Sequence, residues 1–312
     1  MAAYRKLDEE GKLRERVEQA VALLENCCLC PRRCQVNRSK GDVGKCRTGR
    51  AALVSSFGPH FGEEAPLVGS GGSGTIFFTY CNLRCCFCQN YAISQLGEGQ
   101  AVESNELAEM MLSLERRGCH NINFVSPTHV VPQILEALEI AVRAGLSVPL
   151  VYNSGGYDSV ETLRLLDGIV DIYMPDMKYS DERNAWRLSG IKGYPGANKA
   201  AVKEMHLQVG DLELNNRGVA VRGLLVRHLV LPHDLAGTSG VCRFLSQEIS
   251  TDTYINVMAQ YRPCYRASDV PELTRSIAEE EFAEAVRTAR HYGLHRLDSI
   301  EPRLFARLAR IL

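Results

Sequence analysis

The stretch GTIFFTYCNLRCCFCQN, residues 74–90, predicts a β-strand that leads straight into a metal-binding loop. Its first seven residues are an apolar run rich in β-branched and aromatic side chains, which is typical of a strand. Cys81, Cys85 and Cys88 follow, separated by three and two residues. Three thiolates on one loop can hold three irons of a [4Fe–4S] cluster and leave the fourth iron open to a ligand.

The same loop has a plainer interpretation as a structural zinc loop or a chance cluster in a chain of twelve cysteines. A structural zinc site needs four ligands, usually in two separated pairs, and this loop does not supply them. Cys86 adjoins Cys85 and is expected to point elsewhere. The spacing therefore favours an iron–sulfur cluster with one open position.

Short apolar runs alternate with amphipathic patterns after this loop. Further strands are predicted over 121–127, 148–154, 169–178, 223–232 and 253–260. Helices are predicted over 103–118, 130–145, 158–168, where Asp158 is the expected cap, 238–249 and 276–293. This alternation is typical of βα units around a mainly parallel sheet. Six strands are fewer than the eight of a full barrel, so we expect an α/β fold with a partial (β/α)6 barrel.

The chain upstream of the barrel is expected to form a separate metal-binding extension. We assign residues 1–70 to a helix, over 4–26, plus a cysteine-rich lobe, and residues 71–312 to the barrel with its C-terminal helices. The Gly-rich passage at 69–74 predicts a linker or a loop that approaches a ligand closely.

The cysteine-rich lobe carries a second candidate metal site. Cys27, Cys30, Cys34 and Cys46 have two, three and eleven residues between them, which suits four thiolate ligands to zinc or to a second iron–sulfur cluster. Cys28 is an alternative first ligand. Seven Lys or Arg residues against one acid lie between positions 31 and 50, which gives either a docking site for an acidic protein or an ordinary solvated face.

Overall composition excludes several classes of protein. A formal net charge of −1 over 312 residues gives no whole-chain case for binding nucleic acid or an anionic membrane. No apolar stretch approaches the length of a membrane span. The first twenty residues are too charged for a secretory signal peptide. We therefore expect a cytoplasmic protein whose cysteines are metal ligands or reactive thiols.

The run GSGTIFFTYCNLRCCFCQNYAISQ, residues 72–95, resembles the radical S-adenosylmethionine enzymes, and among them homologues of the pyruvate formate-lyase activating enzyme. The resemblance covers roughly residues 70–270 and implies a partial barrel. It implies that the open iron binds S-adenosylmethionine and that reductive cleavage releases a 5′-deoxyadenosyl radical that abstracts hydrogen. Phe87, before the third cysteine, is expected near the adenine. A reductase such as flavodoxin or ferredoxin would supply the electron.

The resemblance also places cofactor contacts at the carboxyl ends of the strands. Activating enzymes carry a Gly-Gly-Glu motif after the second strand, but this chain has no glutamate there. Thr128, or the backbone around Ser126, is expected to replace that contact. His129 is expected to be a structural histidine.

An acid and a base follow the fourth strand. The resemblance implies that Lys178 contacts the cofactor and that Asp176 helps to hold a monovalent cation with Asn153, Ser154 and Met174. Asn153 stands where those enzymes have aspartate. The alternative is an ordinary ion pair at the barrel rim.

Three further positions complete the expected cofactor site. Gly155, with its neighbour Gly156, suits close approach of backbone to a ligand. Arg227, in the middle of an apolar strand, needs an anionic partner, either the cofactor carboxylate or an acid in a structural salt bridge. Gln260 or Asn256 is expected to contact the ribose.

These features favour a radical enzyme, and the resemblance makes activation of a glycyl radical enzyme the first candidate reaction. A radical enzyme that modifies a small molecule or another protein is the alternative. A non-catalytic zinc or iron–sulfur protein is a further alternative, which predicts no binding of S-adenosylmethionine. A radical enzyme that modifies RNA would need an RNA-binding appendage, and the sequence shows none.

Overall fold

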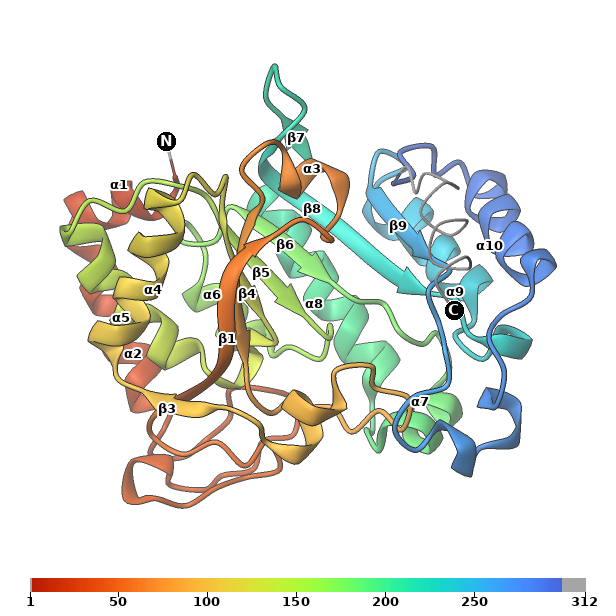
Figure 1. Cartoon of the computed structure of the whole chain (residues 1–312), viewed down its shortest axis with the longest axis horizontal. Helices are drawn as coiled ribbons and strands as arrows, with labels where there is room; N and C mark the ends of the chain where they lie inside the picture. Colours follow the sequence, from red (N-terminus) through yellow and green to blue (C-terminus); the bar gives the residue numbers. More distant parts are fainter. Residues whose placement is uncertain (1, 299–312) are drawn as a thin grey trace.

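The fold is organised by a nine-stranded sheet that is parallel at its centre and rolled into part of a barrel (Figure 1). The computed structural model describes residues 2–298, so the end of the predicted 71–312 unit lies outside the described residues. Six strands pair in parallel, in the order β2, β4, β5, β6, β8, β9. Their bounds are Ser73–Phe78, Ile122–Val125, Leu150–Ser154, Ile172–Pro175, Ala220–Leu229 and Tyr254–Met258. The predicted partial barrel of six parallel strands is confirmed.

Helices cover the outside of this sheet (Figure 1). The expected helices appear as α4 Ser104–Arg116, α5 Val131–Arg143, α6 Val160–Leu165, α9 Thr238–Phe244 and α10 Glu279–His291. The sequence analysis missed α7 Glu182–Ser189 and α8 Tyr194–Val209. Apolar and polar residues are mixed around α8 and a proline stands in its first turn, so the periodic signal of a helix is weak there.

Alternation along the strands sorts side chains between two environments. In β5, Leu150 and Tyr152 pack outward against the helices, whereas Val151 packs inward. The inward apolar residues form a separate buried cluster: Leu67, Val151, Ile172, Met174, Leu212, Ala220 and Leu225. Leu67 comes from α3, Ala65–Val68, which precedes the first barrel strand.

The N-terminal segment is built onto the barrel. The helix expected over 4–26 is two helices, α1 Tyr4–Glu9 and α2 Lys12–Ala22, because Gly11 adopts φ +72° between them. The helix α2 packs against α5. Strand β1, Ala52–His60, pairs antiparallel with β2 on one side and with β3, Gln100–Val102, on the other. The expected boundary at residue 70 thus falls between two paired strands.

The Gly-rich passage at 69–74 packs closely against the chain around it. A Cβ on Gly71 would lie 1.9 Å from the carbonyl oxygen of Gly118. Gly69, at φ +47°, packs against the ring of His120. The glycines are needed because the backbone here passes directly over the turn after α4.

A short two-residue strand, β7 Glu213–Leu214, pairs antiparallel with β8 at the far edge of the sheet.

No helix within residues 2–298 is long and apolar enough to cross a membrane.

Candidate active site

The three cysteines of the loop after β2 are free thiols with separate hydrogen-bond partners. The N–H of Leu83 donates to Cys81 Sγ at 3.4 Å, and Ser189 Oγ donates to Cys85 Sγ at 2.9 Å. Cys88 Sγ lies 3.0 Å from the hydroxyl of Ser94. Sulfur atoms on one loop, each next to a polar hydrogen, fit a bound iron–sulfur cluster, whose sulfurs accept such bonds.

The helix α7 fixes the shape of this loop. The N–H of Arg84 donates to the carbonyl of Ser189 at 3.0 Å, and the N–H of Cys86 donates to that of Leu188 at 2.8 Å. Asp181 caps the start of α7 by accepting from the N–H of Asn184. The end of a helix that the sequence analysis missed therefore holds the cysteine loop. Cys86 makes only backbone bonds of this kind, as expected for a thiol outside the site.

Burial sets the protonation state of the Cys81 and Cys85 thiols when no metal is bound. Burial, with a smaller contribution from the nearby Cys88, raises the pKa of Cys81 to about 11. Burial likewise raises the pKa of Cys85 to about 12, against the lowering effect of Lys178. These thiols are neutral at pH 7 on their own, so metal binding must displace their protons.

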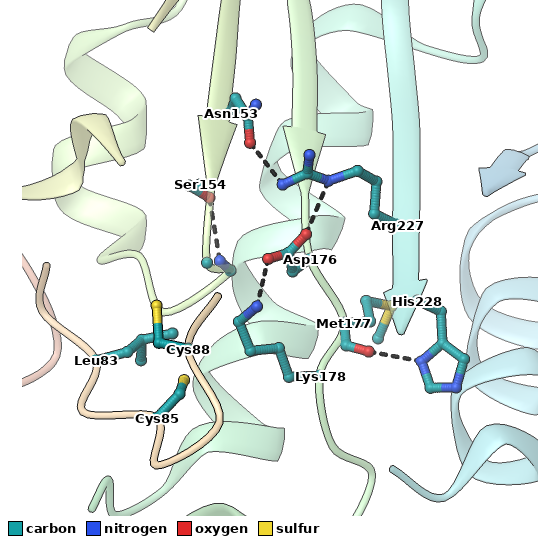
Figure 2. A network of polar contacts seen from close by, with 12 residues as sticks. Leu83, Cys85, Cys88, Asn153, Ser154, Asp176, Met177, Lys178, Arg227 and His228 are labelled. Carbon is teal, nitrogen blue, oxygen red and sulfur yellow. Dashed lines mark hydrogen bonds and ion pairs between the residues drawn. The ribbon is translucent and has the colours of Figure 1, made fainter. Parts of the chain in front are cut away.

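A charged network lies at the strand ends beside the loop (Figure 2). Lys178 Nζ lies 2.5 Å from Asp176 Oδ2, and Arg227 Nε lies 2.8 Å from Asp176 Oδ1. Arg227 Nη2 also donates to Asn153 Oδ1 at 2.7 Å. Figure 2 shows Lys178 between Asp176 and the loop that carries Cys85 and Cys88. The residues expected at three separate strand ends thus meet in one place.

The network fixes the charges of its members. Burial alone would raise the pKa of Asp176, but Arg227 and Lys178 hold that pKa below its ordinary value. Burial opposes the charge on Lys178, yet Asp176 and Cys85 raise its pKa to about 12. Asp176 is therefore an anion between two cations. Asp176 supplies an anion of the kind that Arg227 was expected to need. Its two carboxylate oxygens are paired with Lys178 and Arg227, although Asp176 was expected to help hold a monovalent cation.

Glu64, which the sequence analysis missed, joins this network from outside the strands. It lies just before α3, and its side chain is 5% exposed. Its Oε1 lies 3.9 Å from Arg227 Nε and accepts from Asn256 Nδ2 at 3.1 Å. Burial raises the pKa of Glu64, partly offset by Arg227. No pattern around residue 64 marks it, because its neighbours in space are 160 or more residues away in sequence.

Several buried polar atoms near this network have no hydrogen-bond partner within the described part of the chain. They are Glu64 Oε2, Asn256 Oδ1 and both amide atoms of Asn123 on β4. Buried polar atoms are rarely left without a partner, and such a group is typical of a site that holds a polar ligand or ordered water.

Thr128 and Ser154 were expected to contact the cofactor or a cation, and in the structure both bind Asp158. Thr128 Oγ1 and Ser154 Oγ donate to the two carboxylate oxygens of Asp158, each at 2.6 Å, and Tyr152 adds a third bond at 3.0 Å. Asp158 is 2% exposed, and burial raises its pKa against these three bonds. The N-cap of α6 is Ser159, not Asp158 as expected, because the carboxylate is already engaged in the interior.

The paired glycines pack closely against other parts of the site. A Cβ on Gly155 would lie 2.6 Å from Leu83 of the cysteine loop, and one on Gly156 would lie 2.1 Å from the carbonyl oxygen of Asp176. Tyr194 OH donates to that carbonyl at 3.1 Å, and Asn198 Nδ2 donates to it at 2.9 Å. Both residues belong to α8, which locks the strand ends together.

Phe87 belongs to the cysteine loop, and Gln260 contacts the same loop. The ring of Phe87 is buried and packs edge-on against Tyr179 and Tyr261, with ring centres 6.5 and 5.9 Å apart. Gln260 is exposed, and its carbonyl oxygen accepts from Gln89 of the loop at 2.8 Å. The contact of Gln260 with the loop is through its backbone.

The basic segment between residues 31 and 50 is largely engaged within the chain. Arg33 pairs with Glu161, and Arg50 pairs with Glu136. Arg38 is fully buried. Five of the seven basic residues are nevertheless exposed, as an ordinary solvated face predicts, and Arg38 is the buried exception.

Comparison with known proteins identifies the family. A model of the radical SAM superfamily matches residues 75–212. An uncharacterized protein of Methanocaldococcus jannaschii is 34% identical over 289 residues, which cover 89% of this chain and 78% of that protein.

Solved structures share the fold at low identity. A radical SAM methyltransferase from Sphaerobacter thermophilus has a TM-score of 0.50 at 14% identity over 70% of this chain and 64% of that one. The FeFe-hydrogenase maturase HydG from Carboxydothermus hydrogenoformans has a TM-score of 0.51 at 10% identity over 75% of this chain and 55% of that one. The chain thus spans less than two thirds of each solved structure. It belongs to the radical SAM superfamily, whose cofactors are a [4Fe–4S] cluster and S-adenosylmethionine.

Proposed function

We propose that Cys81, Cys85 and Cys88 hold the [4Fe–4S] cluster and that the chain uses it to cleave S-adenosylmethionine and abstract hydrogen from a substrate. A cluster held by these three thiolates would supply one electron for cleavage of the sulfonium, which would release methionine and a 5′-deoxyadenosyl radical able to take a hydrogen atom from a substrate. The observation that carries this proposal is the Lys178–Asp176–Arg227 network, which lies beside the three free thiols (Figure 2).

Lys178 is the residue that we propose for the cofactor carboxylate. Asp176 keeps it charged, with a pKa of about 12, so it offers an ammonium group at any physiological pH. An ammonium carries three donors, and one of them is used by Asp176 at 2.5 Å. The others are available to an anion placed between the network and the loop.

We propose that Glu64 binds the amino group of the cofactor. Activating enzymes carry a glutamate for this role after the second strand, and this chain has none there. Glu64 Oε2 is buried and has no hydrogen-bond partner among residues 2–298, and the same holds for Oδ1 of its neighbour Asn256. Both atoms accept hydrogen bonds, which a cationic amino group provides. Asn153 and Arg227 hold Asp176 in place, while Thr128, Ser154 and Gly155 position the strand ends and the loop.

The adenosine end of the cofactor is assigned to Phe87 and Gln260. Phe87 lies in an aromatic cluster with Tyr179 and Tyr261, which offers apolar surface to an adenine. Gln260 follows β9 next to this cluster and is the proposed ribose contact. A reductase such as flavodoxin or ferredoxin is proposed as the electron donor.

A backbone glycine of a partner enzyme is the substrate that we propose to test first, on the resemblance to the pyruvate formate-lyase activating enzymes. The solved relatives reported above are a methyltransferase and a hydrogenase maturase, so they do not support this choice over other substrates. A small molecule or another protein is the alternative substrate class.

The proposed chemistry is tested on protein purified without oxygen. The reduced protein should give a [4Fe–4S]⁺ electron paramagnetic resonance signal that changes when S-adenosylmethionine is added, and 5′-deoxyadenosine should form in the same tube. Lys178→Met should keep the signal but lose its response to the cofactor. An iron-free protein after reconstitution, with no cleavage product, would contradict the proposal.

A further inference from the structure

The four expected ligands of the cysteine-rich lobe share one small cavity. Cys27, Cys30, Cys34 and Cys46 all line it, although they come from turns up to nineteen residues apart. Cys28 does not line it, because its thiol turns away and donates to the carbonyl of Asn26 at 3.0 Å. The open choice between Cys27 and Cys28 is thereby resolved in favour of Cys27.

The backbone of this lobe is arranged to bring these thiols together. The N–H of Gln35 donates to the carbonyl of Cys27 at 2.9 Å, which places Cys34 beside Cys27. A Cβ on Gly44 would lie 2.9 Å from Cys34 Sγ, so the turn before Cys46 also approaches closely. Arg33, Gln35 and Arg47 take positive φ angles of 41°, 57° and 55°. Strained residues of this kind persist where the surroundings fix them, often at ligand sites.

A buried cation without a carboxylate partner lies against this cavity. Arg38 is 0% exposed, and Nε and Nη2 both donate to the carbonyl of Gly49 at 3.1 and 2.9 Å. Its Nη1 donates to the carbonyl of His129 at 2.8 Å and lies 3.9 Å from Cys27 Sγ. Within residues 2–298 no acid forms an ion pair with it. A buried guanidinium needs a counter-charge, and neutral thiols do not supply one.

His129 adds an unpartnered atom to the same place. Its ring is 2% exposed, and Nε2 lies 2.9 Å from the carbonyl of Thr79, so that nitrogen must carry the proton. The other ring nitrogen, Nδ1, therefore carries a lone pair, and it has no partner in the described part of the chain. Because His129 lines the cavity too, a metal or a ligand of a metal would satisfy it.

We propose that Cys27, Cys30, Cys34 and Cys46 bind a second metal centre as four thiolates and that Arg38 is its buried counter-ion. Each thiol passes its proton to solvent as its bond to the metal forms. Four thiolates outweigh the charge of either a zinc ion or an oxidised [4Fe–4S] core, so the centre is an anion in both cases. Within residues 2–298 no three cysteine, histidine or acidic side chains are grouped closely enough to hold one ion, so metal binding would have to draw the four thiols together. Four thiolates suit either zinc or an iron–sulfur cluster.

The second centre lies directly behind the first cysteine loop. Asn82, which follows Cys81, lines the same cavity, and its carbonyl accepts from Arg32 Nε at 2.6 Å. Figure 1 shows residues 27–50 as a loop-rich lobe at the end of the barrel that also carries the loop after β2. The two sites share no cysteine, so each can be removed while the other is measured.

Metal analysis of the full chain tests the proposal. The variant Cys81→Ala/Cys85→Ala/Cys88→Ala, reconstituted with iron and sulfide or with zinc, should still bind about four irons with sulfide, or one zinc. Adding Cys27→Ala/Cys30→Ala/Cys34→Ala/Cys46→Ala should remove this metal. Equal metal in the two variants would overturn the proposal.

The reverse variant, which lacks only the four cysteines of the lobe, guards against misinterpreting a variant that does not fold. Removing the four lobe cysteines alone should lower total iron by about half relative to the unmodified chain, or remove its zinc. Circular dichroism shows whether each variant is folded, and Cys28→Ser should keep all of its metal. Unchanged metal in a folded variant without the four cysteines would also overturn the proposal.

Two substitutions of Arg38 test its role as counter-ion. Arg38→Lys keeps the charge, whereas Arg38→Gln keeps a donor without the charge. In the variant lacking the three loop cysteines, Arg38→Gln should weaken metal binding against a competing chelator by about 10–100-fold, with a smaller loss for Arg38→Lys. Equal retention in both would show that the charge of Arg38 does not act on the metal.

Discussion

The two cysteine groups of this chain are built from the same ligand type but balance charge in opposite ways. The loop after β2 faces a network in which Asp176 sits between two cations, so its charges are settled before any ligand arrives. In the lobe upstream, Arg38 lies against the thiol of Cys27, and no acid among the described residues forms an ion pair with it. In the proposed assignments, the first site has its charges paired before a cofactor binds, while the second obtains its counter-charge from the metal centre.

Each group also contains one adjacent cysteine that stays outside the site. Cys86 follows Cys85 and Cys28 follows Cys27. The thiol of Cys28 turns to the carbonyl of Asn26 and does not line the cavity, and Cys86 is the cysteine that we expect outside the proposed cluster. Cys28 and Cys86 are therefore matched controls for the proposed ligands beside them.

The largest expected difference is in the cleavage of S-adenosylmethionine. Cys88→Ala should reduce formation of 5′-deoxyadenosine to background, because the cluster loses one of three protein ligands. Cys46→Ala should leave most of the activity when dithionite supplies the electrons, because the other site keeps its ligands. An inactive but folded Cys46→Ala with its loop cluster intact would show that the second centre takes part in cleavage.

The next effect is on stability at the charged network. Asp176→Ala leaves Lys178 and Arg227 buried without their anion and should lower the free energy of unfolding by about 3–5 kcal/mol. Urea denaturation of the metal-free chain measures it, with Asp176→Asn as the milder control. A loss of under about 1 kcal/mol would mean that solvent already screens the two cations.

A smaller effect is the response of stability to acid. The pKa of Asp176 in the folded chain lies below its usual value of 3.8, because the cations outweigh burial. This carboxylate therefore stabilises the fold above pH 3.8, and its contribution disappears as the pH falls through the lower, folded pKa. Asp176→Asn should flatten the loss of stability in that range. A slope unchanged by the substitution would assign the acid response to other carboxylates.

The smallest expected effects belong to the spare cysteines. Cys28→Ser and Cys86→Ser should each change the free energy of unfolding by no more than about 0.5 kcal/mol and leave iron, sulfide and zinc unchanged. Serine can replace the thiol of Cys28 in its bond to Asn26. A loss of metal in either variant would show that the spare thiol is itself a ligand.

The sequence by itself determined the features that depend on local pattern. Six apolar runs with helical segments between them specify a parallel partial barrel, and the spacing of Cys81, Cys85 and Cys88 specifies the kind of metal site. The same kind of reasoning pointed to Asp176 and Lys178, which follow a buried strand, and to Arg227, which lies within one, because charged groups beside or inside an apolar run need a partner.

Only the tertiary structure decided how those groups are partnered. It gave Asp176 to both Lys178 and Arg227, brought Glu64 to the network from before the barrel, and used α8 to lock the strand ends. It also set Arg38 against the thiol of Cys27. These contacts join residues far apart in sequence, and their strength comes from burial, which a local pattern does not contain.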